Sequence, residues 1–147
     1  MKPLLTIALS LALFALAHSQ ANTAATNRPP ASAVSLTQTN WRLEDLNGHG
    51  VAGPVQSTLF LSNGGHATGS GGCNRFSAQA TLSGDSIHFG TIGLTRKTCG
   101  HDVNSQEMKY ILALESAERW KIDGATLLIF SKGADKPLRF TQFTPTR

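Results

Sequence analysis

Between residues 41 and 143, apolar and polar positions alternate in a series of short segments. A period of two is typical of β-strands that bury one face and expose the other. Several segments end at residue pairs that favour tight turns, namely Asn47-Gly48, Gly84-Asp85 and Asp123-Gly124. The pattern predicts strands at 41–46, 58–61, 76–82, 87–89, 92–94, 120–122, 126–130 and 137–143.

The segment from Asp102 to Ala117 has a helical period instead. Its expected apolar stripe consists of Val103, Tyr110, Ile111, Leu114 and Ala117. Asn104 and Glu107 have the spacing of a capping box, in which each side chain binds a free backbone N–H of the first helical turn. Asp102 is the alternative N-cap, so we expect the helix to begin near this position.

Strands outnumber helices in this prediction, and the short loops favour antiparallel pairing of neighbouring strands. The chain has 147 residues, which allows one domain with a single core. We therefore expect a mainly β (α+β) fold, a small antiparallel β-barrel or roll with one packed α-helix. Five phenylalanines are expected to fill its interior: Phe60, Phe76, Phe89, Phe130 and Phe140.

The N-terminus has the pattern of a cleavable signal peptide over residues 1–19. Lys2 precedes an apolar stretch from Leu4 to Ala17, which is shorter than the about 20 residues that a transmembrane helix needs. The small residues Ala17 and Ser19 predict cleavage after position 19, with cleavage after Ala21 as the alternative. Because no cysteine lies at either cleavage site, where a bacterial lipoprotein carries its lipid anchor, we expect a periplasmic or secreted protein with no stable membrane anchor.

Composition divides the rest of the chain into three parts. Residues 20–39 are rich in Ala, Thr, Ser, Asn and Pro and are expected to form a flexible linker. The folded domain is expected at 40–143, and 144–147 form a C-terminal tail. The net charge of +4 drops to +3 (12 basic against 9 acidic residues) once Lys2 is removed. This mild excess without a basic stripe excludes a nucleic acid as the expected partner.

Cys73 and Cys99 are the only cysteines, and in an exported protein such a pair is expected to form a disulfide. Closing this loop would stabilise the fold by about 3 to 4 kcal/mol. The alternative is a nucleophilic Cys73, with His66 or His88 as its base.

The stretch from Gly69 to Phe76 is unusually rich in glycine. It lacks the lysine and the following helix of a phosphate-binding loop. We expect the glycines to form a bulge or sharp bend in a barrel strand, with Asn74 satisfying backbone groups locally. Contact with a ligand is the alternative.

Thr95, Arg96 and Lys97 precede the second cysteine and would lie near Arg75 if the cysteines pair. They could form a small cationic, hydroxyl-rich spot that holds an anion, or simply a solvated loop. The four histidines of the mature chain have no metal-ligand spacing, and Asp102-x-Asn104 lacks the rest of a calcium loop. We expect no metal, no cofactor and no catalytic residues.

Several motifs in this order resemble the META domain, also called HslJ-like. They are Trp41-x-Leu43, Gly71-Gly72-Cys73-Asn74-Arg75-Phe76, Ile87-x-Phe89, Thr95-Arg96-x-x-Cys99, Glu107-x-x-Tyr110-x-x-x-Leu114 and Leu127-x-Ile129. Where this chain has Lys97-Thr98, the family often has Met-Ala. The resemblance implies a compact β-rich fold with one helix, and envelope or secreted proteins linked to heat-shock or stress responses. It implies no established catalytic activity and leaves the motif positions Gly71, Gly72, Asn74, Arg75, Thr95 and Arg96 without an assigned role.

We therefore expect a non-enzymatic binding or interaction module of the cell envelope, related to stress and acting as a monomer. Its partner would be an unknown envelope protein or a small ligand. The alternatives are a secreted protease inhibitor that presents a rigid loop, a carrier of small apolar ligands, and a small enzyme that uses Cys73.

Overall fold

A computed structural model describes residues 34–145 of the chain. The expected signal peptide 1–19, both of its cleavage sites and positions 20–33 of the expected linker lie outside the described residues. The strands are β1 (Asn40–Asp45), β2 (Thr58–Leu61), β3 (His66–Ser70), β4 (Arg75–Ser83), β5 (Ser86–Phe89), β6 (Gly93–Leu94), β7 (Ala117–Asp123), β8 (Thr126–Ser131) and β9 (Leu138–Gln142). The helix α1 (His101–Glu115) lies between β6 and β7 in the sequence.

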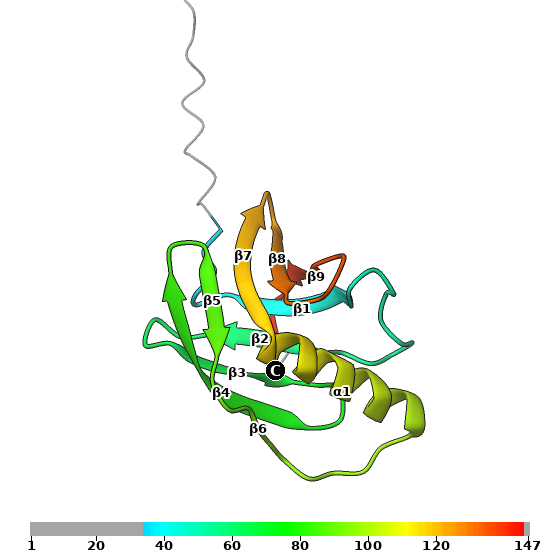
Figure 1. Ribbon diagram of the computed structural model, residues 1–147. Coiled ribbons are helices and arrows are strands. Elements are labelled where there is room, and N and C mark those ends of the chain that lie inside the picture. The colour runs from blue at the N-terminus through cyan, green and yellow to red at the C-terminus, as the bar shows by residue number, and fades with distance from the viewer. Residues whose placement is uncertain (1–33, 146–147) are drawn as a thin grey trace, which may run out of the picture. The chain divides into compact units, whose positions relative to one another are not determined.

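Eight of these strands form a closed antiparallel barrel (Figure 1). Neighbouring strands pair in the order β3-β2-β1-β9-β8-β7-β5-β4, and pairing of β3 with β4 closes the circle. The short strand β6 adds to β4 outside this circle. The expected fold, a small antiparallel barrel with one packed helix, is confirmed.

Alternation along the strands determines which side chains enter the barrel. In β4, Phe76, Ala78 and Ala80 are buried, whereas the residues between them are exposed. In β8, Leu127 and Ile129 are fully buried in the same way. The period of two in the sequence therefore corresponds to the inward and outward faces of the barrel wall.

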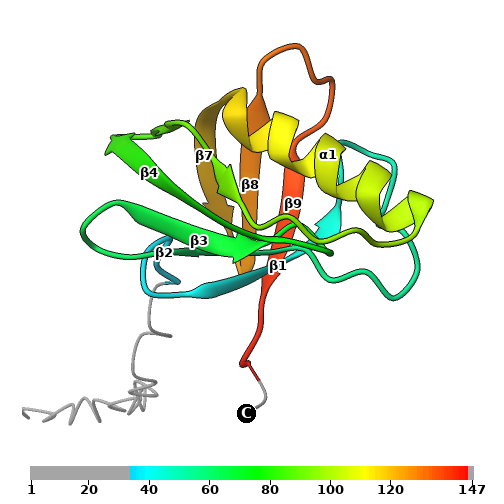
Figure 2. The same cartoon turned by 90° about the horizontal axis from the view of Figure 1, so that it is seen from below.

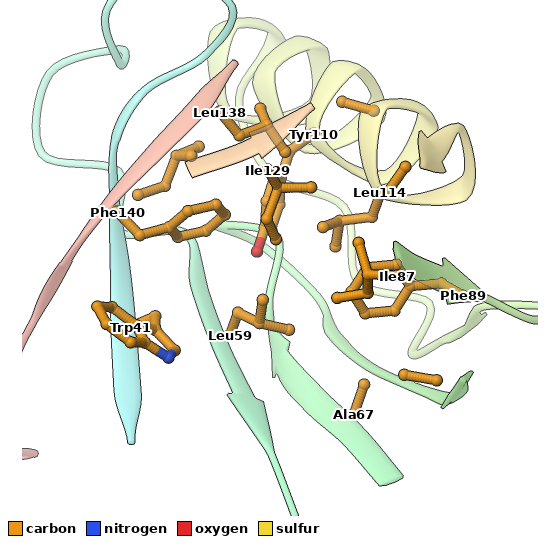
Figure 3. Packing of buried hydrophobic residues seen from close by; sticks show 14 of the residues in the cluster. Trp41, Leu59, Ala67, Ile87, Phe89, Tyr110, Leu114, Ile129, Leu138 and Phe140 are labelled. Atoms are coloured by element: carbon orange, nitrogen blue, oxygen red, sulfur yellow. The ribbon is translucent and has the colours of Figure 1, made fainter. Parts of the chain in front are cut away.

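Large apolar side chains occupy the barrel interior (Figure 3). Trp41 and Phe140 are fully buried, and the indole Nε1 of Trp41 donates a hydrogen bond to the Leu36 carbonyl at 3.0 Å. The expected filling by five phenylalanines is only partly correct. Phe76, Phe89 and Phe140 are buried, but Phe60 and Phe130 are half-buried because they alternate with the inward residues of β2 and β8.

Helix α1 lies across one end of the barrel (Figures 1 and 2). Tyr110 and Leu114 point from it into the interior and are fully buried. The Tyr110 ring packs between Phe76 and Phe140, with 6.1 Å between ring centroids in each pair. Its hydroxyl donates to the Thr58 carbonyl of β2 at 3.1 Å, so the helix is attached to the wall by both packing and a hydrogen bond. Among residues 34–145, no helix is long and apolar enough to cross a membrane.

The end of the linker and strand β3 differ from the sequence-based prediction. The end of the expected linker, residues 34–39, packs on the barrel: Leu36 is buried and the Gln38 N–H donates to the Leu61 carbonyl. Strand β3 was not predicted, because its Gly69-Ser70 end has the composition of a loop. Gly69 is needed there, since a Cβ at this position would lie 2.0 Å from the Thr58 carbonyl oxygen of the paired strand.

The predicted helix cap is wrong. Gly100 occupies the N-cap position without a side-chain hydrogen bond, so Asp102 does not cap either. Asn104 bonds to the backbone of Cys99, and Glu107 points to a different loop altogether. Ala117, expected as the last residue of the helical stripe, is instead the first residue of β7.

Tyr110 provides a test of the packed interior, because it is the only tyrosine and the tyrosinate absorbance band reports on it alone. Burial raises the pKa of Tyr110 well above its ordinary value of 10.0. The folded protein therefore keeps this proton at pH values where the unfolded chain loses it, and stability falls as pH rises above about 10. We expect the tyrosinate band to appear only together with loss of the strand signal in circular dichroism.

The urea-unfolded chain is the control and should show the band near the ordinary pKa. A folded protein that ionises Tyr110 at that same pH would contradict the packing described here.

Candidate functional site

The motif residues meet where the loop between β3 and β4 approaches the loop between β6 and α1. Cys73 and Cys99 form a disulfide between these loops, with an S–S distance of 2.03 Å and a Cα–Cα distance of 6.0 Å. The expected disulfide is confirmed. Since each sulfur is bonded to the other, neither cysteine carries the free thiol that a nucleophilic mechanism needs.

We call the loop between β3 and β4, which contains Cys73, the disulfide loop. The carboxylate of Glu107, on α1, is buried beneath it, and 8% of this residue is exposed. Its Oε2 accepts the backbone N–H groups of Cys73 at 3.0 Å and Asn74 at 2.5 Å. Its Oε1 accepts the side-chain Nδ2 of Asn74 at 2.7 Å. Within residues 34–145 no basic group lies within 4.0 Å of this carboxylate, so N–H dipoles rather than a cation compensate its charge.

The side chain of Asn74 makes four hydrogen bonds and connects the two loops to the helix. Its Oδ1 accepts the Thr95 hydroxyl at 2.8 Å and the Lys97 N–H at 2.7 Å. Its Nδ2 donates to the Lys97 carbonyl at 3.2 Å and to Glu107. An amide has two N–H donors and two acceptor lone pairs, so all four positions are used. Asn74 thus satisfies backbone groups, but those of Lys97 in another loop rather than the local ones that the sequence predicted.

The two glycines before Cys73 are explained by close contacts. A Cβ on Gly71 would lie 2.5 Å from Cγ of Glu107, and one on Gly72 would lie 2.4 Å from Cγ1 of Val55. Gly72 also has φ +124°, a left-handed backbone conformation that favours glycine. The glycines therefore make the tight turn that brings two backbone N–H groups onto one carboxylate.

A second buried polar contact lies beside the first. Gln106, the neighbour of Glu107 on α1, donates from Nε2 to the Ser57 hydroxyl at 3.2 Å and accepts the backbone N–H of Ala52 at Oε1. The Ser57 hydroxyl donates to the Gly71 carbonyl at 2.8 Å. Two consecutive helix residues therefore attach two loops directly to the end of the barrel, the one between β1 and β2 and the one between β3 and β4, and Asn74 links the loop that contains Lys97 to them.

Sequence reasoning identified Gly71, Gly72, Asn74 and Thr95 but missed Ser57, Gln106 and the role of Glu107. A signal for Glu107 was present: with Tyr110, Ile111 and Leu114 it has the spacing of the buried helix stripe, where a carboxylate requires partners.

The expected cationic spot is not formed by mutual contacts. Thr95 belongs to the network, since its hydroxyl also accepts the Arg75 N–H at 3.1 Å. The side chains of Arg75, Arg96 and Lys97 are exposed and make no hydrogen bond or ion pair with any described residue. Over residues 34–145, no group of three or more His, Cys, Asp or Glu side chains could hold a metal ion.

A cleft of about 710 Å³ lies along α1, on the face that carries Asp102, Lys109 and Leu112 and not on the face that carries Glu107. One wall is the helix from Asp102 to Ser116, and the other is formed by residues 46–52 and 131–135. Its apolar lining includes Leu46, Val51, Leu112 and Ala134, and its charged lining includes Asp102, Lys109, Lys132 and Asp135. Sequence patterns did not predict this cleft, because its walls are a helix and two loops that are distant in sequence.

The geometry defines a small closed antiparallel barrel whose end is covered by a helix and fixed by a Gly-Gly-Cys-Asn loop. The model of the META domain matches residues 34–144, and the chain belongs to this family. The match begins at residue 34, the first residue that the structure describes.

Solved structures resemble the whole described fold. An NMR structure of a protein from Burkholderia xenovorans is 25% identical, with a TM-score of 0.62, and the alignment covers 80% of this chain and 97% of that one. A second NMR structure is 21% identical with a TM-score of 0.59, covering 74% of this chain and 94% of the other. Among proteins with curated annotation, none matches this chain.

Replacing Asn74 by aspartate tests the network with almost no change in shape. Asn74→Asp removes the donor to the Lys97 carbonyl and places a second carboxylate where Nδ2 now lies 2.7 Å from Oε1 of Glu107. We expect the free energy of unfolding, measured by urea denaturation with the disulfide intact, to fall by about 3 kcal/mol.

The matched control is Asn63→Asp in an exposed turn, which should change stability by no more than about 0.5 kcal/mol. Equal changes in the free energy of unfolding of the two variants would show that the hydrogen bonds of Asn74 stabilise the fold no more than those of an exposed turn residue.

Proposed function

We propose that this protein is an exported, non-enzymatic binding module of the cell envelope, and that the cleft beside α1 is its binding surface. The disulfide loop is then the structural element that holds the cleft's helix in place. The proposal rests on the cleft itself, because its volume of about 710 Å³ lies within the range of ligand sites in proteins.

The pairing of Glu107, Asn74 and the two cysteines supports a role without catalysis. A general base needs a free lone pair that can reach substrate, and a nucleophile needs a free hydroxyl or thiol. Both carboxylate oxygens of Glu107 accept protein N–H groups, all four positions of Asn74 are used, and the cysteines are bonded to each other. These residues therefore offer a substrate no free thiol and no exposed carboxylate.

Export is supported by the disulfide together with the signal-peptide pattern at 1–19, since disulfides persist in oxidising compartments. A link to stress comes only from the family resemblance. The barrel interior is filled by side chains such as Trp41 and Phe140, so the proposal places the ligand outside the barrel rather than inside it.

Site-specific photocrosslinking in the native host tests the cleft as the binding surface. A photoreactive phenylalanine analogue replaces Leu112, which lines the cleft and is 57% exposed. We expect a discrete adduct from position 112, because a bound partner covers this side chain. The mass of the protein recovered from the envelope or medium also reports whether the signal peptide has been removed.

The control is the same analogue at Leu94, which is 42% exposed on β6 and does not line the cleft. Adducts from Leu94 alone, or identical adducts from both positions, would contradict the assignment of the cleft. Recovery of the uncleaved chain in the cytoplasm would contradict export.

A further inference from the structure

The loop between β6 and α1 contains an exposed arginine whose backbone is free. Every residue from Thr95 to Cys99 is exposed, and this segment, the 95–99 loop, contains no helix, turn or bend. It runs along the outside of the barrel towards the start of α1 (Figure 1). Neither the backbone N–H nor the carbonyl of Arg96 forms a hydrogen bond with any residue of 34–145. Arg96 is therefore open to a partner through both its side chain and its main chain.

The residues on both sides of Arg96 are held in place. The Thr95 hydroxyl donates to Oδ1 of Asn74 at 2.8 Å. The same Oδ1 atom accepts the Lys97 N–H at 2.7 Å, and Nδ2 of Asn74 donates to the Lys97 carbonyl at 3.2 Å. The disulfide follows two residues later, at Cys99. Because its neighbours are already fixed, presenting Arg96 to a partner costs little conformational entropy.

The guanidinium of Arg96 has no acidic partner in this part of the molecule. Between Asp45 and Asp102 the only acidic residue is Asp85, which lies in the turn between β4 and β5. The carboxylate of Glu107 is buried and accepts N–H groups of the disulfide loop. Arg96 forms no ion pair with any described residue. A partner that offers a carboxylate in a pocket therefore meets an unpaired guanidinium, and such a contact is strong.

These features match what a trypsin-like serine protease binds. Such an enzyme takes one basic side chain into a specificity pocket that carries an aspartate, and it places the carbonyl oxygen of the same residue in its oxyanion hole. Arg96 offers both groups. The preceding strand, β6, is an edge strand that pairs only with β4, so its other edge is open to an added strand of the enzyme.

We propose that the 95–99 loop inhibits trypsin-like serine proteases. Arg96 enters the specificity pocket, and the peptide bond between Arg96 and Lys97 is presented to the catalytic serine. This function goes beyond the cleft, because none of the residues of the 95–99 loop lines the cleft.

The contacts of Asn74 explain why the loop blocks the enzyme and is not consumed. The catalytic serine adds its oxygen to the Arg96 carbonyl carbon, and the catalytic histidine moves the serine proton to the Lys97 nitrogen as the C–N bond breaks. The products are an ester at Arg96 and a free amine at Lys97. Asn74 and the disulfide keep this amine beside the ester, so the amine attacks the ester, reforms the peptide bond and returns the proton to the serine.

The probe is trypsin, whose activity on a small chromogenic substrate is measured during titration with the full chain, disulfide intact. We expect an inhibition constant below about 1 µM. Arg96→Ala should weaken inhibition at least about hundredfold, because the specificity pocket loses its occupant. Arg96→Lys should retain inhibition to within about tenfold, since the pocket accepts either basic side chain. Chymotrypsin, whose pocket is apolar, should be inhibited at least about hundredfold less strongly than trypsin.

Arg139→Ala is the matched control. Arg139 is also an exposed arginine, but it lies on β9, across the barrel from β4, so its replacement should leave inhibition unchanged. Arg96 is exposed too, so its replacement leaves the core intact.

Four results would overturn the proposal. They are no inhibition at about 10 µM, undiminished inhibition by Arg96→Ala, equal inhibition of chymotrypsin, and loss of inhibition as catalytic amounts of trypsin convert the chain to a form cleaved after Arg96. Each of these results leaves the cleft as the proposed binding surface. In the crosslinking experiment, a protease adduct from position 94 would differ in mass from the cleft adduct expected from position 112.

Discussion

One buried carboxylate holds the helical end of this barrel together. Glu107 accepts two backbone N–H groups of the disulfide loop and one from the Asn74 side chain, and among the described residues no basic group lies within 4.0 Å of it. Removing the carboxylate would leave these donors without partners in a poorly hydrated site, at about 1 to 3 kcal/mol for each. The tight Gly71-Gly72 turn, the position of Asn74 and the approach of the 95–99 loop all depend on this contact.

The same helix has two faces with different roles. Glu107, Tyr110 and Leu114 face the barrel and fix α1 by hydrogen bonds and packing. Lys109 and Leu112 face outward and form a wall of the cleft. Because hydrogen bonds of Glu107 and packing of Tyr110 and Leu114 fix the inner face, the outer face presents its side chains in a constant arrangement. A preorganised surface loses less conformational entropy on binding, which suits a recognition role.

The strand pattern predicted the fold well because alternation directly reports burial of one face. It failed at β3, where close approach to Thr58 requires Gly69 and the composition imitates a loop. The spacing of Asn104 and Glu107 predicted a capping box, but tertiary contacts with Cys99 and the Cys73-Asn74 backbone compete for both side chains. The disulfide and the glycine bend could be expected from residue types alone. The cleft could not, because it arises from the relative positions of distant loops.

The most direct test of this account is a double-mutant cycle between Asn74 and Glu107. The free energy of unfolding in urea is measured, with the disulfide intact, for Asn74→Ala, Glu107→Ala and the double variant. If the two side chains form one network, the losses of the single variants will sum to at least about 1 kcal/mol more than the loss in the double variant. Losses that add to within about 0.5 kcal/mol would show that the two residues act independently, and would contradict the central role given to this contact.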